Sequence, residues 1–197
     1  SALAYDFFNC DMQQAAHGRA CAVATGIKRV QPNATVFTYQ GDGDLASIGI
    51  AETIHAANRG ENITVIFVNN AIYGMTGGQL APTTLIGQMT TTSQQGRSEA
   101  KHGLPIRIAE MFATIGEVDD VERVSLHQPR AVNQAKKAIL KAFTYQRQQQ
   151  GFTMIEFLST CPVGWGMTPV ESLKWSSQQM TAYFPLGVFK DSGDSHE

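Results

Sequence analysis

The sequence predicts an α/β fold, with a mostly parallel central sheet that carries helices on both faces. Two apolar runs, 35–39 and 63–68, are rich in β-branched and aromatic residues, as buried strands are. Between them, 45–58 has the apolar spacing of a helix and is followed by the stop signal Arg59-Gly60. A strand, a helix and a strand in succession form a βαβ unit, and its crossover makes the two strands parallel.

The rest of the chain is expected to continue this alternation. Residues 13–30 predict a helix that ends at Gln31-Pro32, because proline cannot continue it. Residues 81–103 are rich in Thr, Ser, Gln and Gly and predict a long surface loop that contacts a partner. Further helices are expected at 105–115, 130–150 and 169–184, strands at 122–126 and 152–158, and a polar tail at 191–197. The basic side chains of the 130–150 helix are expected to form a solvated face: Lys136, Lys137, Lys141 and Arg147.

Composition excludes several classes of protein. The 197 residues suffice for one well-buried domain, and 43% hydrophobic against 16% charged residues is typical of a globular chain rather than a disordered one. A net charge of −2 gives no reason to expect nucleic acid or an anionic membrane as a partner. There is no apolar run of transmembrane length and no signal-peptide pattern. Three widely spaced cysteines do not make a disulfide framework, so a cytoplasmic location is expected.

Polar residues follow directly after both strands of the βαβ unit. Because parallel strands end at the same edge of a sheet, Asp42 and Asn70 are expected to face each other across a short gap. A carboxylate, an amide oxygen and a backbone carbonyl suit Mg²⁺, which leaves its other positions to water or phosphate. Gly43 permits close approach of the backbone, and the next helix offers N–H groups to an anion. The pattern predicts a magnesium–diphosphate site.

The motifs GDGDLASIG, NNAIYGMTGGQ and PTT resemble the thiamine-diphosphate motif of the 2-oxoacid:ferredoxin oxidoreductase β subunits, most of all the branch that acts on 2-ketoisovalerate. The resemblance continues through 9–20, 161–166 and 185–189 and covers nearly the whole chain. It implies the thiamine-diphosphate-binding fold, with 1–197 as one domain. It also implies that Mg²⁺ is held by Asp42, Asn70 and the backbone oxygen of Ile72.

Other cofactor contacts are implied by the same resemblance. By itself, a histidine in an Ala-rich helix is more often a packed or solvent-facing residue, but the HGRA segment lies beside thiamine diphosphate in the family. The further cofactor contacts expected are Ser1, His17, Gly18, Arg19, Gly43, Asp44, Gly74, Met75 and Thr76.

The segment that follows Asn70 also indicates a substrate preference. Met75 suits a branched aliphatic substrate, because a flexible apolar side chain adapts to such a tail. Some relatives that act on 2-oxoglutarate have a lysine at the position of Gly77, so a second substrate carboxylate is disfavoured here.

The cysteines are assigned mainly by the resemblance. In the family, a cysteine at the position of Cys161 joins three upstream cysteines in holding a [4Fe–4S] cluster, which takes four thiolates. This chain supplies one of that set, so a cysteine-bearing N-terminal segment is expected before Ser1 and the cluster is expected in the intact protein rather than in this fragment. Cys10 and Cys21 are expected to be packing residues.

The resemblance implies one subunit of a hetero-oligomer that decarboxylates a 2-oxoacid oxidatively, passes the acyl group to coenzyme A and reduces ferredoxin. No catalytic residue is assigned in this chain, because the family takes the carboxylate that activates the cofactor from the α subunit; the chain alone is expected to be inactive. Two alternatives remain open: a non-oxidative thiamine-diphosphate decarboxylase or synthase, and a non-catalytic nucleotide-binding α/β module. The second is disfavoured because GDGD and NN do not fit the GxGxxG pattern.

Overall fold

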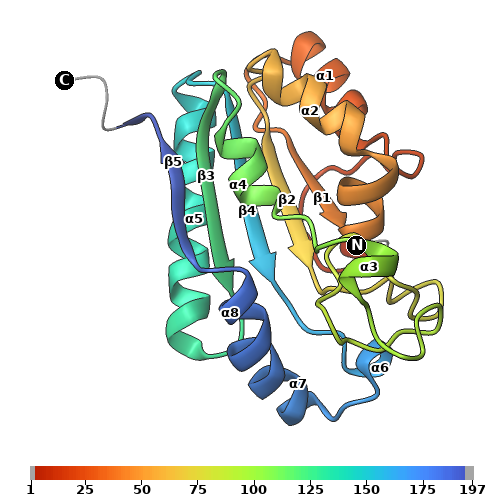
Figure 1. Cartoon of the computed structure of the whole chain (residues 1–197). Helices are drawn as coiled ribbons and strands as arrows, with labels where there is room; N and C mark the ends of the chain where they lie inside the picture. Colours follow the sequence, from red (N-terminus) through yellow and green to blue (C-terminus); the bar gives the residue numbers. More distant parts are fainter. Residues whose placement is uncertain (1–2, 194–197) are drawn as a thin grey trace.

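The computed structural model describes residues 3–193 and contains a five-stranded sheet in the order β1-β2-β4-β3-β5 (Figure 1). The first four strands pair in parallel, and β5 pairs antiparallel with β3. The predicted α/β class with a mostly parallel sheet is therefore confirmed. The strands are β1 (Phe37–Gly41), β2 (Thr64–Asn69), β3 (Val118–Ser125), β4 (Phe152–Leu158) and β5 (Gly187–Asp191).

The strand register brings the carboxyl ends of the parallel strands to one edge. Gly41 pairs with Val68, and Leu158 pairs with both Asn69 and Ser125. The central strand β4 is buried at every residue, because helices cover both faces of the sheet. The segments that leave this edge carry the predicted site residues.

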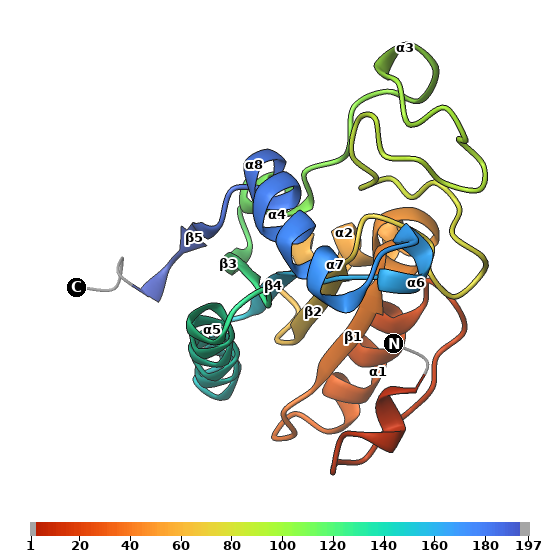
Figure 2. The same ribbon diagram turned by 90° about the horizontal axis from the view of Figure 1, so that it is seen from below.

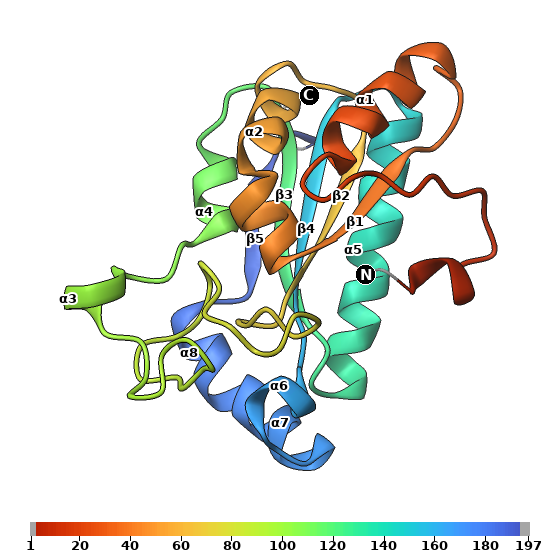
Figure 3. The ribbon, with the colours of Figure 1, turned by 90° about the vertical axis from the view of Figure 1, so that its right-hand side faces the viewer.

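Helices cover the two faces of the sheet (Figure 3). On one face, α1 (Ala20–Val30), α2 (Ile50–Asn58) and α4 (Ile108–Ala113) share an apolar core with the strands. On the other, α5 (Pro129–Arg147) packs its alanines against β2, β3 and β4. The shorter helical segments are a 3₁₀ turn (Ala4–Asp6), α3 (Glu99–His102), α6 (Pro162–Trp165), α7 (Pro169–Trp175) and α8 (Thr181–Tyr183), with π-helical turns at Asp44–Ile48 and Ser176–Met180. Among residues 3–193, none of the helices combines the length and the apolar character that crossing a bilayer requires.

The start of the first long helix differs from the prediction. The helix begins at Ala20 instead of residue 13, after Gly18 with φ +77°. A Cβ at Gly18 would lie 2.5 Å from the Ile48 side chain and 2.9 Å from the nitrogen of Gly49, so only glycine fits this left-handed turn. The turn takes His17 out of the helix and toward the end of β1.

Three other expectations are corrected at the far side of the sheet. The 169–184 segment is not one helix but α7, a π-helical turn and α8. Asp191 belongs to β5, which was not predicted, and residues 194–197 lie outside the described residues. Lys141 is not a solvated residue: its Nζ lies 2.7 Å from Asp120 and 3.2 Å from Asp191, because β5 brings a carboxylate beside α5. The other three basic residues of α5 are exposed, as predicted.

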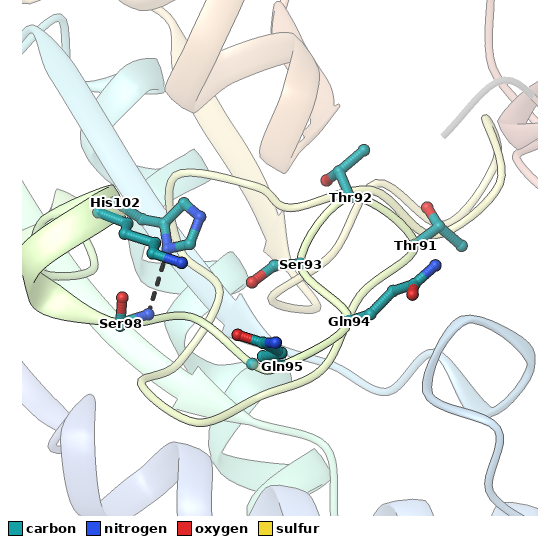
Figure 4. A pocket seen from close by; sticks show the side chains of 9 residues that line it. Thr91, Thr92, Ser93, Gln94, Gln95, Ser98 and His102 are labelled. Carbon is teal, nitrogen blue, oxygen red and sulfur yellow. Dashed lines mark hydrogen bonds between the residues drawn. The ribbon is translucent and has the colours of Figure 1, made fainter.

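The predicted loop at 81–103 is irregular apart from α3 and projects from the sheet on the side opposite α5 (Figure 2). It is not wholly a surface feature, because Arg97 is buried at its centre. The guanidinium donates to the backbone carbonyls of Ala81, Pro82, Thr84, His102, Gly103 and Leu104. A polar pocket of about 560 Å³ opens between Thr91 and His102 (Figure 4), and none of the predicted site residues lines it.

Candidate functional site

Asp42 follows β1 and lies buried beside the end of β2. Its Oδ1 accepts a hydrogen bond of 3.2 Å from the backbone N–H of Asn70. Its Oδ2 accepts a short hydrogen bond from the hydroxyl of Thr83. The prediction that Asp42 and Asn70 face each other is confirmed, and the cause is the parallel register of β1 and β2.

The side chain of Asn70 completes a convergence of polar atoms. One end of its amide lies 3.0 Å from Asp42 Oδ1 and 2.7 Å from the carbonyl oxygen of Ile72. Both of those neighbours are acceptors, so this end of the amide is either a nitrogen that donates to both or an oxygen that needs a cation. Octahedral Mg²⁺ with ligands at about 2.1 Å holds adjacent oxygens about 3.0 Å apart. The donor set and its spacing therefore fit the predicted magnesium ion.

The electrostatics of Asp42 agree with this chemistry. Burial raises the pKa of the Asp42 carboxyl to about 6, although the hydrogen bonds from Thr83 and Asn70 oppose the shift. Within residues 3–193, no three His, Cys, Asp or Glu side chains cluster in a way that would hold a metal. A metal at this edge therefore depends on the amide and carbonyl oxygens of Asn70 and Ile72 as well as on the carboxylate.

A second group of predicted residues gathers around Asp44. Asp44 Oδ1 lies 2.8 Å from His17 Nδ1 and accepts a 2.7 Å hydrogen bond from the N–H of Gly18. Its other oxygen accepts from the Gln40 amide at 2.5 Å. A Cβ at Gly43 would lie 3.8 Å from His17 Nε2 and 3.1 Å from the Tyr73 ring, so the backbone of Gly43 lies close to both.

Arg19 does not join this group through its charge, since its guanidinium pairs with Glu52 at 2.7 Å. Gln40 and Thr83 were not predicted as site residues. Gln40 gives no signal in the sequence because it is one polar residue inside a strand. Thr83 lies in the PTT motif, which signals the region but not the contact with Asp42.

The 71–79 loop continues from Asn70 around the same edge. Ile72 is buried and its carbonyl also accepts from the N–H of Gly74 at 3.0 Å. Met75 is 73% exposed, and the exposed Thr76 bonds to Gln79 at 2.6 Å. The loop thus brings Ile72 and Gly74 to the convergence point, whereas Met75 and Thr76 lie on its exposed surface.

Cys161 lies against this loop. A Cβ at Gly74 would lie 2.7 Å from its Sγ, and the Trp165 indole donates to the carbonyl of Asn70 at 3.0 Å. Cys21 is buried against Thr53 and Gln40, as expected of a packing residue. Cys10 is exposed, so its assignment to packing is wrong: it precedes the Gly18 turn in a segment without regular structure. Ser1 lies outside the described residues.

Comparisons with known proteins agree with the geometry. The family described as thiamine pyrophosphate enzyme, C-terminal TPP binding domain, matches residues 4–157. The ketoisovalerate oxidoreductase subunit VorA of Methanothermobacter thermautotrophicus is 46% identical over 188 residues, which are 95% of this chain and 39% of VorA. The chain belongs to the 2-oxoacid:ferredoxin oxidoreductase family. It carries the thiamine-diphosphate-binding domain of that family, and the resemblance inferred from its motifs is confirmed.

Relatives within this oxidoreductase family differ in their named substrates. The 2-oxoglutarate synthase subunit KorB of Archaeoglobus fulgidus is 41% identical over 158 residues, covering 80% of this chain and 55% of KorB. The chain therefore spans only about two fifths to a half of the length of these relatives. Their subunit letters also differ, A in one and B in the other.

A solved structure supports the fold. The 2-oxoglutarate:ferredoxin oxidoreductase from Magnetococcus marinus, with 2-oxoglutarate, coenzyme A and succinyl-CoA bound, superposes with a TM-score of 0.68. The match covers 89% of this chain and 62% of that one at 24% identity. At this identity the likeness establishes that the two chains share a fold.

Proposed function

We propose that this chain is the β-type subunit that binds Mg²⁺ and thiamine diphosphate in a 2-ketoisovalerate-type 2-oxoacid:ferredoxin oxidoreductase. The enzyme would convert a branched-chain 2-oxoacid to its acyl-CoA and reduce ferredoxin. The observation that carries the proposal is the convergence of Asp42, the Asn70 amide and the Ile72 carbonyl at the carboxyl edge of the sheet. Those oxygens would take three positions of Mg²⁺ and leave the others to the diphosphate and water.

The chain's own residues would orient the cofactor. His17 is held by Asp44 through Nδ1, which leaves Nε2 near Gly43 to face the diphosphate or the thiazolium. Gly43 and the π-helical turn that begins at Asp44 would offer backbone N–H groups to the diphosphate. Gly18, Arg19, Gly74 and Thr76 remain proposed contacts. When bound, thiamine diphosphate supplies the nucleophilic carbon and the electron sink.

The substrate preference rests on the 71–79 loop. Met75 is exposed on this loop and offers a flexible apolar side chain to a branched aliphatic tail. Gly77 has φ +115°, a conformation that disfavours any side chain there, including the cationic one that a second substrate carboxylate would call for. The name of the 46% identical relative, a ketoisovalerate oxidoreductase subunit, supports the same preference.

The remaining parts of the reaction are assigned to partners. The α subunit would supply the carboxylate that activates the cofactor, so this chain alone would be inactive. Coenzyme A and ferredoxin would be co-substrates in the cytoplasm, and no nucleic acid or membrane partner is proposed. Cys161 would ligate a [4Fe–4S] cluster in the intact protein together with three cysteines that this chain does not contain. Its position against Gly74 would set the cluster beside the cofactor loop.

The test is calorimetric titration with thiamine diphosphate, with and without Mg²⁺, of the chain assembled with its partner subunit. Asp42→Asn removes one charged ligand, and Asp119→Asn serves as a control outside the site. We expect Mg²⁺-dependent binding in the wild type and the control, and a loss of affinity of about 100-fold or more in Asp42→Asn. Binding that is indifferent to Mg²⁺ or to Asp42 would contradict the assignment.

Turnover separates the proposed reaction from its alternative. The assembled enzyme should consume 2-ketoisovalerate faster than 2-oxoglutarate, and only when both coenzyme A and ferredoxin are supplied. Turnover that proceeds when both coenzyme A and ferredoxin are left out would identify a non-oxidative decarboxylase or synthase instead.

A further inference from the structure

The residue before the proposed metal ligand Asn70 connects the ligand turn to the core. Asn69 ends β2 and is fully buried. Its amide nitrogen donates to Glu156 Oε1 at 2.7 Å, and its amide oxygen accepts from the N–H of Ala71 at 3.1 Å. One side chain therefore bonds both to the middle of the sheet and to the backbone between the two ligand-bearing residues Asn70 and Ile72.

That backbone has an unfavourable conformation. Ala71 has φ +58°, in the left-handed region that residues with a Cβ seldom adopt. Its N–H is held by Asn69, and its carbonyl accepts from the Thr84 hydroxyl at 2.7 Å. Such a conformation persists only when its surroundings impose it. The two hydrogen bonds thus hold the turn that directs the Asn70 side chain and the Ile72 carbonyl toward Asp42.

Glu156, to which Asn69 bonds, is itself fixed by a buried ion pair. Its Oε2 accepts from Arg123 Nε at 2.9 Å and from the N–H of Ala109 at 3.3 Å. The guanidinium of Arg123 also bonds to Glu110 and to the Pro185 carbonyl. The polar connection runs across β2, β4 and β3, and the side chains of Asn69, Glu156 and Arg123 are all buried.

A buried ionic network of this kind is an expensive way to stabilise a sheet, since apolar side chains of similar volume often do as well or better. The network would be worth this cost if it fixes the geometry of the Asn70–Ile72 turn at its end. The rings of Phe184 and Phe189 lie 5.2 and 4.8 Å from the Arg123 guanidinium and restrict its movement further. The network therefore gives Asn69 a rigid support rather than an adjustable one.

We propose that Asn69, supported by Glu156 and Arg123, is a positioning residue that holds the Asn70–Ile72 turn in the conformation required for Mg²⁺ and thiamine diphosphate. The proposal rests on the proposed function of the site. Asn69 touches neither the metal nor the cofactor; it acts through the backbone of Ala71. Residues that orient metal ligands in this way typically change metal affinity by about 10- to 100-fold when they are removed.

The experiment compares Asn69→Ala, Asn69→Ser and the control Thr153→Val. Asn69→Ala removes both hydrogen bonds, whereas the hydroxyl of Asn69→Ser can still accept from the N–H two residues on. Thr153 is also buried, on β4 near the opposite end of the sheet, and its hydroxyl bonds to the hydroxyl of Thr64. Each variant, assembled with its partner subunit, is titrated with thiamine diphosphate and Mg²⁺. The unfolding free energy and the hydrogen exchange of the Ala71 and Gly74 amides are measured in the metal-free chain.

Positioning predicts that Asn69→Ala lowers Mg²⁺-dependent affinity by about 10- to 100-fold and speeds exchange at Ala71 and Gly74. Asn69→Ser should recover part of both, although it too loses the bond to Glu156. Thr153→Val should lose stability without either effect. Unchanged affinity in Asn69→Ala, or losses that follow global stability equally in all three variants, would overturn the proposal.

Two further outcomes keep the proposals separate. If the wild type shows no Mg²⁺-dependent binding, the proposed function fails, while the exchange rates still decide whether Asn69 holds the turn. If Asn69→Ala does not fold, the Asn69→Ser variant carries the comparison, and wild-type exchange and affinity in that variant would overturn positioning.

Discussion

Two buried aspartates lie at opposite ends of the sheet and differ in the charge that accompanies them. Asp120, near the start of β3, has the Lys141 ammonium 2.7 Å away. Asp42, after the end of β1, is bonded to neutral donors, which include the Thr83 hydroxyl and the backbone N–H of Asn70. Burial raises the pKa of both carboxyls to about 6. Among residues 3–193, the fold therefore supplies a cationic partner for the Asp120 carboxylate and none for the Asp42 carboxylate.

The difference separates a buried carboxylate that is paired within the fold from one that is not. At Asp120, Lys141 joins three carboxylates, since it also lies 3.2 Å from both Glu122 and Asp191. These contacts connect α5, β3 and the edge strand β5, so the cluster is part of the sheet's construction. At Asp42 the neighbouring groups are the backbone N–H and side-chain amide of Asn70 and the Thr83 hydroxyl, none of which carries a positive charge.

The largest change in unfolding free energy is expected from Lys141→Met. It leaves the buried Asp120 beside two other carboxylates, so unfolding free energy should fall by about 3 kcal/mol at pH 8. The loss should be smaller at pH 5, because Asp120 can then be protonated. Urea denaturation at the two pH values measures this. A variant as stable as the wild type at pH 8 would show that Asp120 does not depend on its lysine.

A smaller effect of opposite sign is expected from Asp42→Asn in the absence of Mg²⁺. The amide removes a buried charge that no cationic side chain balances, while its oxygen still accepts from Asn70 and the Thr83 hydroxyl accepts from its nitrogen. Unfolding free energy should rise by about 1–2 kcal/mol at pH 8. Thermal or urea unfolding of the metal-free chain provides the measurement. A clear destabilisation would mean that Asp42 is a structural carboxylate like Asp120, and the contrast between them would disappear.

The smallest effect is expected from Asp120→Asn, with Lys141 still paired to Glu122 and Asp191. In the wild type the folded pKa of Asp120 lies above its unfolded value of 3.8. The folded state then binds more protons between these values, so this group's contribution lowers stability as pH rises toward about 6. The variant should lack that contribution, so the difference in unfolding free energy between it and the wild type should widen from pH 4 to pH 7. If the unfolding free energies of the variant and the wild type depended on pH in the same way, the raised pKa of Asp120 would be contradicted.

The sequence predicts best where local pattern and burial agree. The bounds of β4 were predicted as observed because 152–158 is a short apolar run that is buried on both faces. The approach of Asp42 to Asn70 was also predictable, since parallel strands must end at one edge. Both predictions depend on rules that need no knowledge of distant contacts.

The features that the sequence did not predict depend on contacts between residues far apart in the chain. The late start of α1 depends on the contact of Gly18 with Ile48 and Gly49, which lie far along the chain. The edge strand β5 is short and half exposed, so its pattern is weak, and its pairing with β3 is what brings Asp191 to Lys141. The bond between Asn69 and Glu156 likewise joins strands that are adjacent only in the folded sheet. No local pattern encodes these contacts.

The carbonyl groups gathered around Arg97 have a consequence for the handling of the protein. A loop of this polarity and length is ordinarily the first place that a protease cuts. Here one guanidinium gathers six backbone carbonyls from 81–84 and 102–104, which closes the loop at its base. Cleavage requires an extended, accessible backbone, so the base of the loop should survive trypsin while more exposed lysines and arginines are cut. Trimming the loop to obtain a smaller protein would therefore remove a folded unit rather than a dispensable tether.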